Sequence, residues 1–332
     1  MTLSINPSRP SSLQYDLVTL LCCQDWWGWE SVFYIEGGAS LVWLLFWLLL
    51  ASDTPASHPL ITPAERDYIQ AELPATNLVS LPVPWRRIWT SLPFWAVVVA
   101  NFGNNWCFHL LMTELPLYLS DVFPDYMNSG SKTGLWTAIP YGTMWLTSVL
   151  VSFITDYLIR NKILSTAVVR KCSNSLAHMG PTICLLMIVI FVSNSNLMMN
   201  FTLAMFTVGV GCMGALYSSW IINTQDIAPN FAGTLLGVTN CIGSIPGFVA
   251  PRIAGQIVNS NPSDVSKWRI VWIIAIIILV IETIFYIIFA AGTPQSWNFP
   301  SKESEGKTKD GKRDWFLVSI KIFYRQNFFF HF

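Results

Sequence analysis

Seven long apolar stretches constrain the fold of this 332-residue chain more than any motif does. Each has about the 20 residues that an α-helix needs to cross a bilayer core of roughly 30 Å. Because every unpaired backbone amide in hydrocarbon costs several kcal/mol, stretches of this length must be helical. We therefore expect an all-α polytopic membrane protein. The predicted spans are Val32–Ala51, Phe94–Leu119, Gly134–Leu158, Cys172–Ser193, Asn200–Ile222, Phe231–Ile257 and Ile270–Ala291.

Composition argues against several functional classes. Lys plus Arg and Asp plus Glu both number 19, so no overall charge favours binding to nucleic acid. The seven cysteines show no CxxC spacing, and five of them lie in predicted spans, which favours buried thiols over disulfides or a metal site. No spacing of nucleophile and base, or of metal ligands, is present. We therefore expect neither an enzyme nor a bound cofactor.

The basic residues of the loops predict the orientation. With the N-terminus outside, the cytoplasmic segments carry fourteen Lys and Arg residues and the outer loops carry only three. The positive-inside rule favours this arrangement. It places a long loop, residues 52–93, and a charged and aromatic tail, residues 292–332, in the cytoplasm.

Several short motifs are more specific than the apolar pattern. They include Asn-Phe-Gly-Asn-Asn-Trp at residues 101–106, Asp-Ile-Ala-Pro-Asn-Phe-Ala-Gly at residues 226–233, and Thr239-Asn240. Together they resemble the anion:cation symporters of the major facilitator superfamily, which include sodium–phosphate cotransporters, sialin and vesicular glutamate transporters. The resemblance runs from about Gly28 to Pro300 in one register.

That resemblance implies a partial major facilitator fold with seven transmembrane helices, corresponding to family helices six to twelve. Residues 1–31 are then expected to lie outside the family. Residues 32–51 are the last helix of the N-terminal bundle, residues 52–93 its cytoplasmic central loop, and residues 94–291 the C-terminal six-helix bundle. The first five family helices are expected to be missing, as in a truncated product or an incomplete gene model. A missing N-terminal half or a full-length relative is therefore an expected partner.

Polar residues in the second span form the candidate substrate site. Asn101, Asn105, His109 and Thr113 recur every four residues and share one helix face, with Asn104 beside it. Such a stripe should face the bundle interior or a wet cavity. By resemblance, the glutamate transporters have a substrate-contacting arginine at the Asn104 position and a tyrosine at the His109 position. The absence of that arginine favours a phosphate-like anion or a monocarboxylate over a dicarboxylate.

Some of these polar residues have structural explanations that remain open. His109 and Asn240, the candidate substrate contact of the sixth span, can each instead join two helices by hydrogen bonding. Glycines recurring at four-residue spacing, Gly233 with Gly237 and Gly243 with Gly247, predict close helix packing.

Charged residues at the span ends suggest gating or structural roles. Asp156 precedes Arg160 by one helical turn, and Asp226 is expected to cap the following helix. Glu36 and Glu282 lie inside spans where the family has uncharged residues. They are either protonated or tolerated in a chain that does not transport, and both explanations remain open.

The functional expectation is cation-coupled anion transport by alternating access. The coupling ion would be Na⁺ or H⁺, and the location a plasma membrane or a vesicular or lysosomal membrane. A non-transporting fragment that associates with full-length relatives is one alternative. A seven-helix receptor is another, disfavoured because no Asp-Arg-Tyr or Asn-Pro-x-x-Tyr signature stands at a span end.

Overall fold

The structure is a computed structural model that describes residues 30–52, 57–58, 61–72, 82–124, 130–192 and 198–299. Most of the predicted N-terminal segment, parts of the predicted central loop, and the tail beyond residue 299 lie outside the described residues. The chain divides into two compact units, and each is described by itself. Within the described residues every regular element is helical, as the sequence predicts.

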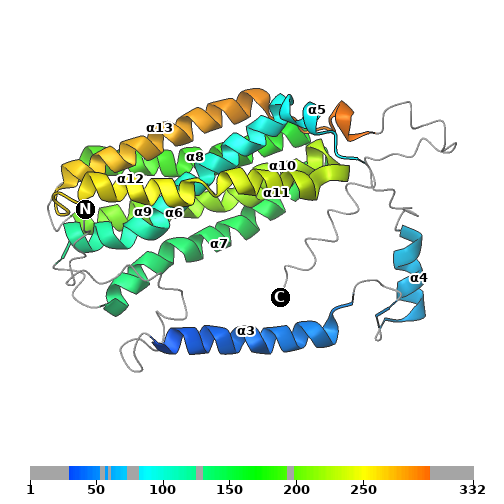
Figure 1. Cartoon of the computed structure of the whole chain (residues 1–332), viewed down its shortest axis with the longest axis horizontal. Coiled ribbons are helices and arrows are strands. Elements are labelled where there is room, and N and C mark those ends of the chain that lie inside the picture. The colour runs from blue at the N-terminus through cyan, green and yellow to red at the C-terminus, as the bar shows by residue number, and fades with distance from the viewer. Residues whose placement is uncertain are drawn as a thin grey trace. The chain divides into compact units, whose positions relative to one another are not determined.

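The smaller unit contains two described helices, α3 (Glu30–Leu50) and α4 (Pro63–Glu72). The window Phe33–Leu50 of α3 is long and apolar enough to cross a membrane, and none of it is buried within the structure. This confirms the first predicted span. The short helix α4, labelled in Figure 1, is polar. Glu65 lies in its first turn, where the helix dipole stabilises a negative charge. The helix lies inside the predicted central loop.

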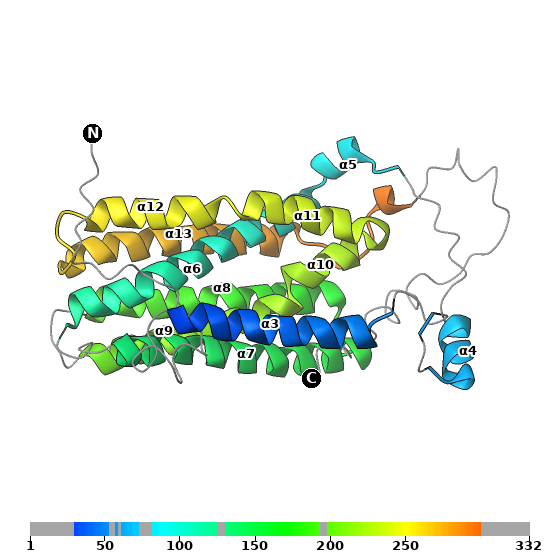
Figure 2. The same ribbon diagram turned by 60° about the horizontal axis from the view of Figure 1, so that its bottom comes forward.

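The larger unit is a bundle that runs from Pro84 to Phe299, slightly beyond the predicted limits of 94 and 291. The chain passes back and forth along it, as Figure 2 shows. Its elements are α5 (Trp85–Trp89), α6 (Leu92–Val122), α7 (Gly130–Arg160), α8 (Thr166–Phe191), α9 (Met199–Met213), η2 (Gly214–Ser218), α10 (Trp220–Ile227), η3 (Pro229–Phe231), α11 (Ala232–Gly243), α12 (Pro246–Val258), α13 (Val265–Phe289) and η4 (Ser296–Asn298).

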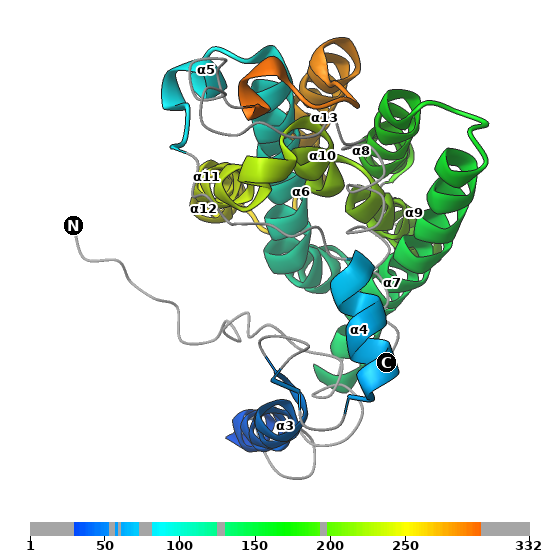
Figure 3. The same ribbon diagram turned by 90° about the vertical axis from the view of Figure 1, so that its right-hand side faces the viewer.

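Six stretches of the described residues are long and apolar enough to span a membrane, one in α3 and five in the bundle. The remaining predicted span, α6, has 31 residues but is less apolar because of its asparagines and His109. It packs against α7, α10, α11, α12 and α13, and an end-on view shows it among these helices (Figure 3). An interior position explains how a helix with this many polar residues is accommodated. The protein is thus a multi-pass membrane protein.

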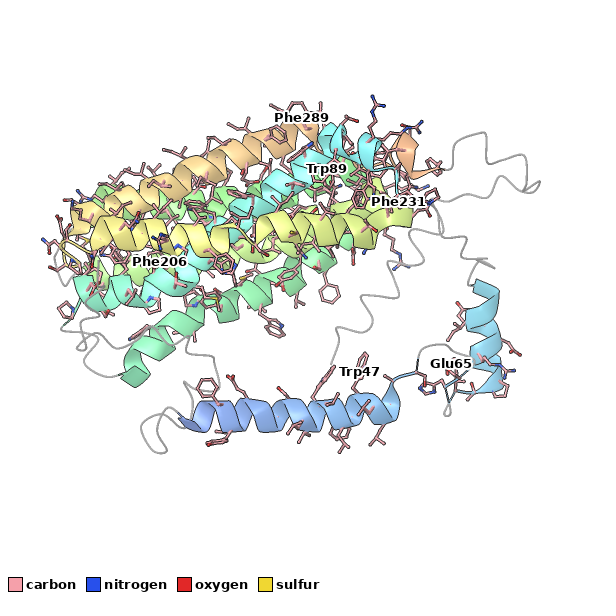
Figure 4. All side chains as sticks on the ribbon, in the orientation of Figure 1. Trp47, Glu65, Trp89, Phe206, Phe231 and Phe289 are labelled. Carbon is pink, nitrogen blue, oxygen red and sulfur yellow. The ribbon has the colours of Figure 1, made fainter. Side chains whose placement is uncertain are left out.

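Aromatic rings hold α6, α9 and α13 together toward one end of the bundle. The ring centroids of Tyr118 and Trp268 lie 5.2 Å apart, and those of Phe206 and Trp272 lie 5.5 Å apart. All four side chains are almost completely buried, and Figure 4 labels Phe206 among the sticks of the bundle. Edge-to-face pairs of this kind contribute about 0.5–1.5 kcal/mol each beyond their buried area.

Two of the bundle passes are broken. Between α9 and α10 the chain tightens into η2, where a Cβ on Gly214 would lie only 2.3 Å from the Met144 carbonyl oxygen of α7. Between α11 and α12 the helix is interrupted at Ser244 and Ile245, directly before Pro246. This interruption lies next to the polar stripe of α6, because Gly243 faces Asn101 and Gly247 faces His109.

The opposite ends of the bundle differ in charge. At one end α6 and α8 begin and α7, α10 and α13 finish. We call it the cation-rich end; its basic residues are Arg86, Arg87, Arg160, Lys162, Arg170 and Lys171. Its assignment to the cytoplasm remains a prediction.

Candidate functional site

An asparagine network joins α6 to α11. Asn101 is completely buried, and its Nδ2 donates to the Thr239 carbonyl oxygen at 2.9 Å and to Asn240 Oδ1 at 3.1 Å. Asn105 Nδ2 donates to the Asn101 carbonyl oxygen at 2.9 Å and also to Asn101 Oδ1. The structure therefore brings together three of the predicted site residues: Asn101, Asn105 and Asn240.

This network determines which donors are left for a ligand. Because Asn240 accepts through Oδ1, its Nδ2 is free of that contact, and the side chain is exposed. His109 lies two turns from Asn101 on α6 and is half-buried. Within the described residues its imidazole makes no hydrogen bond; its ring contacts Phe108 and Gly247 instead. Asn240 and His109 thus supply two hydrogen-bonding groups that the described part of the protein does not use.

Glycines of the broken helix make this approach of helices sterically feasible. A Cβ on Gly243 would lie 2.4 Å from Asn101 Nδ2, and one on Gly247 would lie 3.3 Å from the His109 ring. Both are the close contacts that the glycine repeat predicts. Gly233 and Gly237 differ, because nothing lies within 4 Å of a Cβ built on either. The packing predicted for this second pair is therefore absent from the described residues.

Thr113 of the stripe and Asn104 beside it also do not join the network. Asn104 is buried, and its Oδ1 has no hydrogen-bond partner among the described residues. Thr113 Oγ1 donates to the His109 carbonyl oxygen at 2.8 Å, and it lies 3.4 Å from Glu114 Oε1. The first of these bonds is an ordinary return contact along a helix. The Thr113 hydroxyl is therefore hydrogen-bonded within α6, which makes it a weaker candidate for ligand binding than Asn240 or His109.

Asp226 does not cap the following helix, contrary to expectation. It lies in α10, while the residue before α11 is Phe231, without any side-chain capping bond. Its carboxylate instead pairs with Arg170 of α8, with Arg170 Nε 2.7 Å from Asp226 Oδ2. Arg170 also donates from Nη1 to the Ser218 carbonyl oxygen at 3.0 Å. Because the Asp226 carboxylate is paired with the Arg170 guanidinium, it does not accept hydrogen bonds from the first amides of the next helix.

Arg170 is a residue that the sequence reasoning placed in a loop. Helix α8 begins at Thr166, where the Ser165 hydroxyl accepts from the Val168 amide at 3.4 Å, so Arg170 lies in the second turn. It is almost fully buried, and it acts electrostatically on half-buried Asp156 of α7. Arg160, the predicted neighbour of Asp156, is exposed at the end of α7. Two of the three predicted gating residues, Asp156 and Asp226, therefore interact with one arginine that was not predicted.

A short segment after α13 covers the same end of the bundle. The Gln295 amide donates to the Ile227 carbonyl oxygen at 2.8 Å, and Asn223 Nδ2 donates to the Ala291 carbonyl oxygen at 2.7 Å. Asn298 holds Asn230 through two hydrogen bonds, at 3.0 and 2.9 Å. We call residues 290–299 the strap. The start of the predicted tail is thus part of the packed bundle.

Comparison with known proteins identifies a family and several relatives. The sequence profile of the Major Facilitator Superfamily matches residues 17–251, so it extends into the segment expected to lie outside the family. A Drosophila ananassae protein named "Putative inorganic phosphate cotransporter" is 38% identical over 281 residues, covering 84% of this chain and 56% of that protein. Human vesicular glutamate transporter 2 is 36% identical over 285 residues, covering 84% of this chain and 47% of that protein.

A third relative, vesicular glutamate transporter 3 of Danio rerio, is also 36% identical over 285 residues. The chain spans about half the length of the curated relatives it matches. The profile nevertheless covers well over half of the chain itself. This protein belongs to the Major Facilitator Superfamily, within the anion:cation symporter group that its motifs resemble.

Proposed function

We propose that this chain supplies the C-terminal bundle, and in α3 the last N-terminal-bundle helix, of a transporter that moves a small anion by cation-coupled alternating access. The observation that carries the proposal is the pair of unused groups at the α6 and α11–α12 contact. Asn240 Nδ2 and the His109 imidazole are held in place by the network and by Gly247, yet they bond to nothing among the described residues. Amide and imidazole N–H groups are suitable donors to an anionic oxygen.

The neutral character of these donors favours a singly charged anion. The residues of the stripe are asparagines, a histidine and a threonine, without Lys or Arg. The cost of removing an ion from water rises with the square of its charge, and only paired charges recover that cost. We therefore expect a monoanionic phosphate or a monocarboxylate to bind better than a dicarboxylate. A co-bound cation, Na⁺ or H⁺, would balance the remaining charge.

Alternating access needs a second bundle. In transporters of this kind the site lies near mid-membrane between two bundles that move against each other. The described residues supply one six-helix bundle, and the exposed side of Asn240 and the half-buried side of His109 form one wall of the expected cavity. We expect no coupled uptake by this chain alone, and partial recovery when the N-terminal bundle of a relative is co-expressed.

The test is uptake into liposomes that contain the purified chain with and without that partner bundle. Phosphate, a small monocarboxylate and glutamate are compared under sodium and proton gradients. H109A and N240A should lower phosphate uptake at unchanged protein level, and C241A, at the exposed neighbour of Asn240, is the matched control. Normal uptake by both variants, or preference for glutamate, contradicts the proposed site. Co-purification with the partner bundle without any uptake favours the non-transporting alternative.

A further inference from the structure

Glu282, an unexplained charge in the most apolar span of the bundle, has a partner in the structure. It lies in α13 and is 1% exposed. His178 of α8 places Nδ1 2.7 Å from Glu282 Oε1, and the hydroxyl of Thr283 donates to the same oxygen at 2.9 Å. His178 is at the middle of α8, which spans Thr166–Phe191. An acid and an imidazole therefore meet in the interior of the bundle; we call them the dyad.

Helix α6 is shaped around the dyad. A Cβ on Gly103 would lie 2.5 Å from Glu282 Cγ, so only glycine at this position leaves room for the glutamate side chain. The titratable groups that face Glu282 are His178 from α8, Cys107 from α6 and Tyr286 from α13 itself. Helix α12, whose titratable side chain is Arg252, also packs on α13.

One added proton makes the dyad electrically neutral. Two lone pairs 2.7 Å apart would repel, so a hydrogen lies between His178 Nδ1 and Glu282 Oε1. A neutral imidazole can supply that hydrogen from Nδ1, and the pair then carries a charge of −1, which is costly in a low-dielectric interior. A second hydrogen, on the imidazole Nε2 or on the carboxyl group, makes the pair neutral. The dyad therefore has the groups needed to take up and release one proton.

A polar row on α8 leads from the dyad toward the cation-rich end. Arg170, Asn174, His178 and Thr182 recur every four residues on one face, and all four are buried. Arg170 and His178 are eight residues apart, or about 12 Å along the helix axis. The Arg170–Asp226 pair lies where this row reaches the cation-rich end of the bundle.

Groups along this row have unused hydrogen-bonding capacity. Both amide atoms of Asn174 lack a partner among the described residues, and so do Glu282 Oε2 and the Tyr286 hydroxyl. Tyr286 is also within electrostatic range of Arg170, Asp226 and Glu282, which places it along the row. Buried polar groups are normally paired, and a series of unpaired ones provides sites for bound water through which a proton can pass. A static ion pair would need no such row.

We propose that the His178–Glu282 dyad is a proton-binding site. It takes up its proton from the cation-rich end of the bundle, along the part of the α8 polar row that contains Arg170 and Asn174. Its role as the coupling site rests on the proposed transport function, whereas proton binding itself does not. The dyad is separate from the candidate anion site, which lies on the α11–α12 side of α6.

Infrared difference spectroscopy on the full chain in lipid nanodiscs tests proton binding. Between acidic and alkaline pH, the wild type should lose a protonated-dyad signal that E282Q lacks and H178Q shifts. Absence of any pH-dependent signal assignable to Glu282 overturns the proposal. Because both variants alter a buried pair and can impair folding, the loading route is tested separately in variants that keep the dyad.

Asn174 and Thr182 lie one turn on either side of His178, which provides a matched pair of variants. N174L blocks the row toward the cation-rich end, whereas T182V changes the other side. We expect N174L to slow hydrogen–deuterium exchange of the dyad proton at least tenfold and T182V to leave it unchanged. Slowing by T182V alone, or equal rates in both variants, overturns the proposed route.

Transport then separates this inference from the proposed function. In an assembly that takes up phosphate, E282Q should remove the dependence of uptake on an imposed pH gradient. Unchanged dependence overturns the coupling role while leaving the proposed function intact. If the dyad binds a proton but no assembly takes up anion, the transport proposal fails and the proton site stands.

Discussion

Removing the Asp226 carboxylate should destabilise the cation-rich end strongly, because it would strand a buried guanidinium. Arg170 is 3% exposed and its Nε lies 2.7 Å from Asp226 Oδ2. D226N keeps the shape of the side chain and removes its charge. Breaking a buried pair by removing one partner costs about 3–5 kcal/mol. The Asp226 side chain is 17% exposed, so some water can reach the site and we expect about 3 kcal/mol.

The reverse change should cost less. R170M leaves the carboxylate partly solvated and 3.4 Å from Asn223 Nδ2, so we expect a loss of about 1–2 kcal/mol. The double variant contains no stranded charge. Its total loss should therefore be smaller than the sum of the two single losses, with a coupling free energy of about 2 kcal/mol.

Equilibrium unfolding in mixed micelles, with increasing denaturing detergent, measures these free energies. R160Q at the exposed end of α7 is the control for loss of a surface charge and should cost less than about 1 kcal/mol. Additive losses in the double variant would show that the two residues do not interact. A D226N loss no larger than that of R160Q would refute the reasoning.

The remaining predictions concern close contacts, the strap and the orientation. G243A places a methyl group against a buried asparagine amide of α6 and should cost about 1–3 kcal/mol by the same unfolding assay, whereas G237A has open space around it and should be neutral or stabilising by up to about 1 kcal/mol. N298A removes the hydrogen bond from the Asn230 amide to Asn298 Oδ1, while the bond to the Asn298 backbone carbonyl oxygen remains, and it should speed amide exchange in the strap; unchanged exchange would show that the side-chain bond does not hold it. In a cysteine-free background, a probe cysteine at Lys162 should be labelled only from the cytoplasm and one at Asn261 only from outside, and the opposite pattern would reverse the orientation.

Hydropathy predicted every helix of the bundle that crosses its length, because length and apolar content are local properties. It failed at the ends of helices where polar residues are buried by distant partners. The fourth predicted span began at Cys172, but α8 begins at Thr166. Arg170 looks like a loop residue until Asp226, from α10, is brought beside it. Such a pairing depends on tertiary structure, which a hydropathy window does not contain.

The site could be predicted to a similar extent. The four-residue spacing on α6 identified the stripe, and the structure joins Asn101 and Asn105 to Asn240. The same spacing on α8 went unused, although it would have indicated His178. Glu282 was recognised as anomalous, but its partner could not be identified because no local pattern connects α8 with α13. Periodicity reveals which face of a helix is polar but not which helix it meets.

Helix α6 lies between the two proposed sites. Gly103 faces Glu282, while Asn105, two residues further on, belongs to the anion-site network. At 3.6 residues per turn, two residues are separated by about 200° around the helix and about 3 Å along it. The proposed proton site and the asparagine network beside the proposed anion site therefore lie on opposite faces of α6 at nearly the same depth.

Both faces of α6 are constrained by glycine contacts, Gly103 against Glu282 on one side and Gly247 against His109 on the other. Because protein interiors are close-packed, we expect a displacement of α6 by an anion bound at His109 to change the space available to Glu282. A change of charge at Glu282 would then act back on the anion site with equal coupling free energy. A single rigid helix can thus link the two sites, and no longer chain of intermediate residues is required.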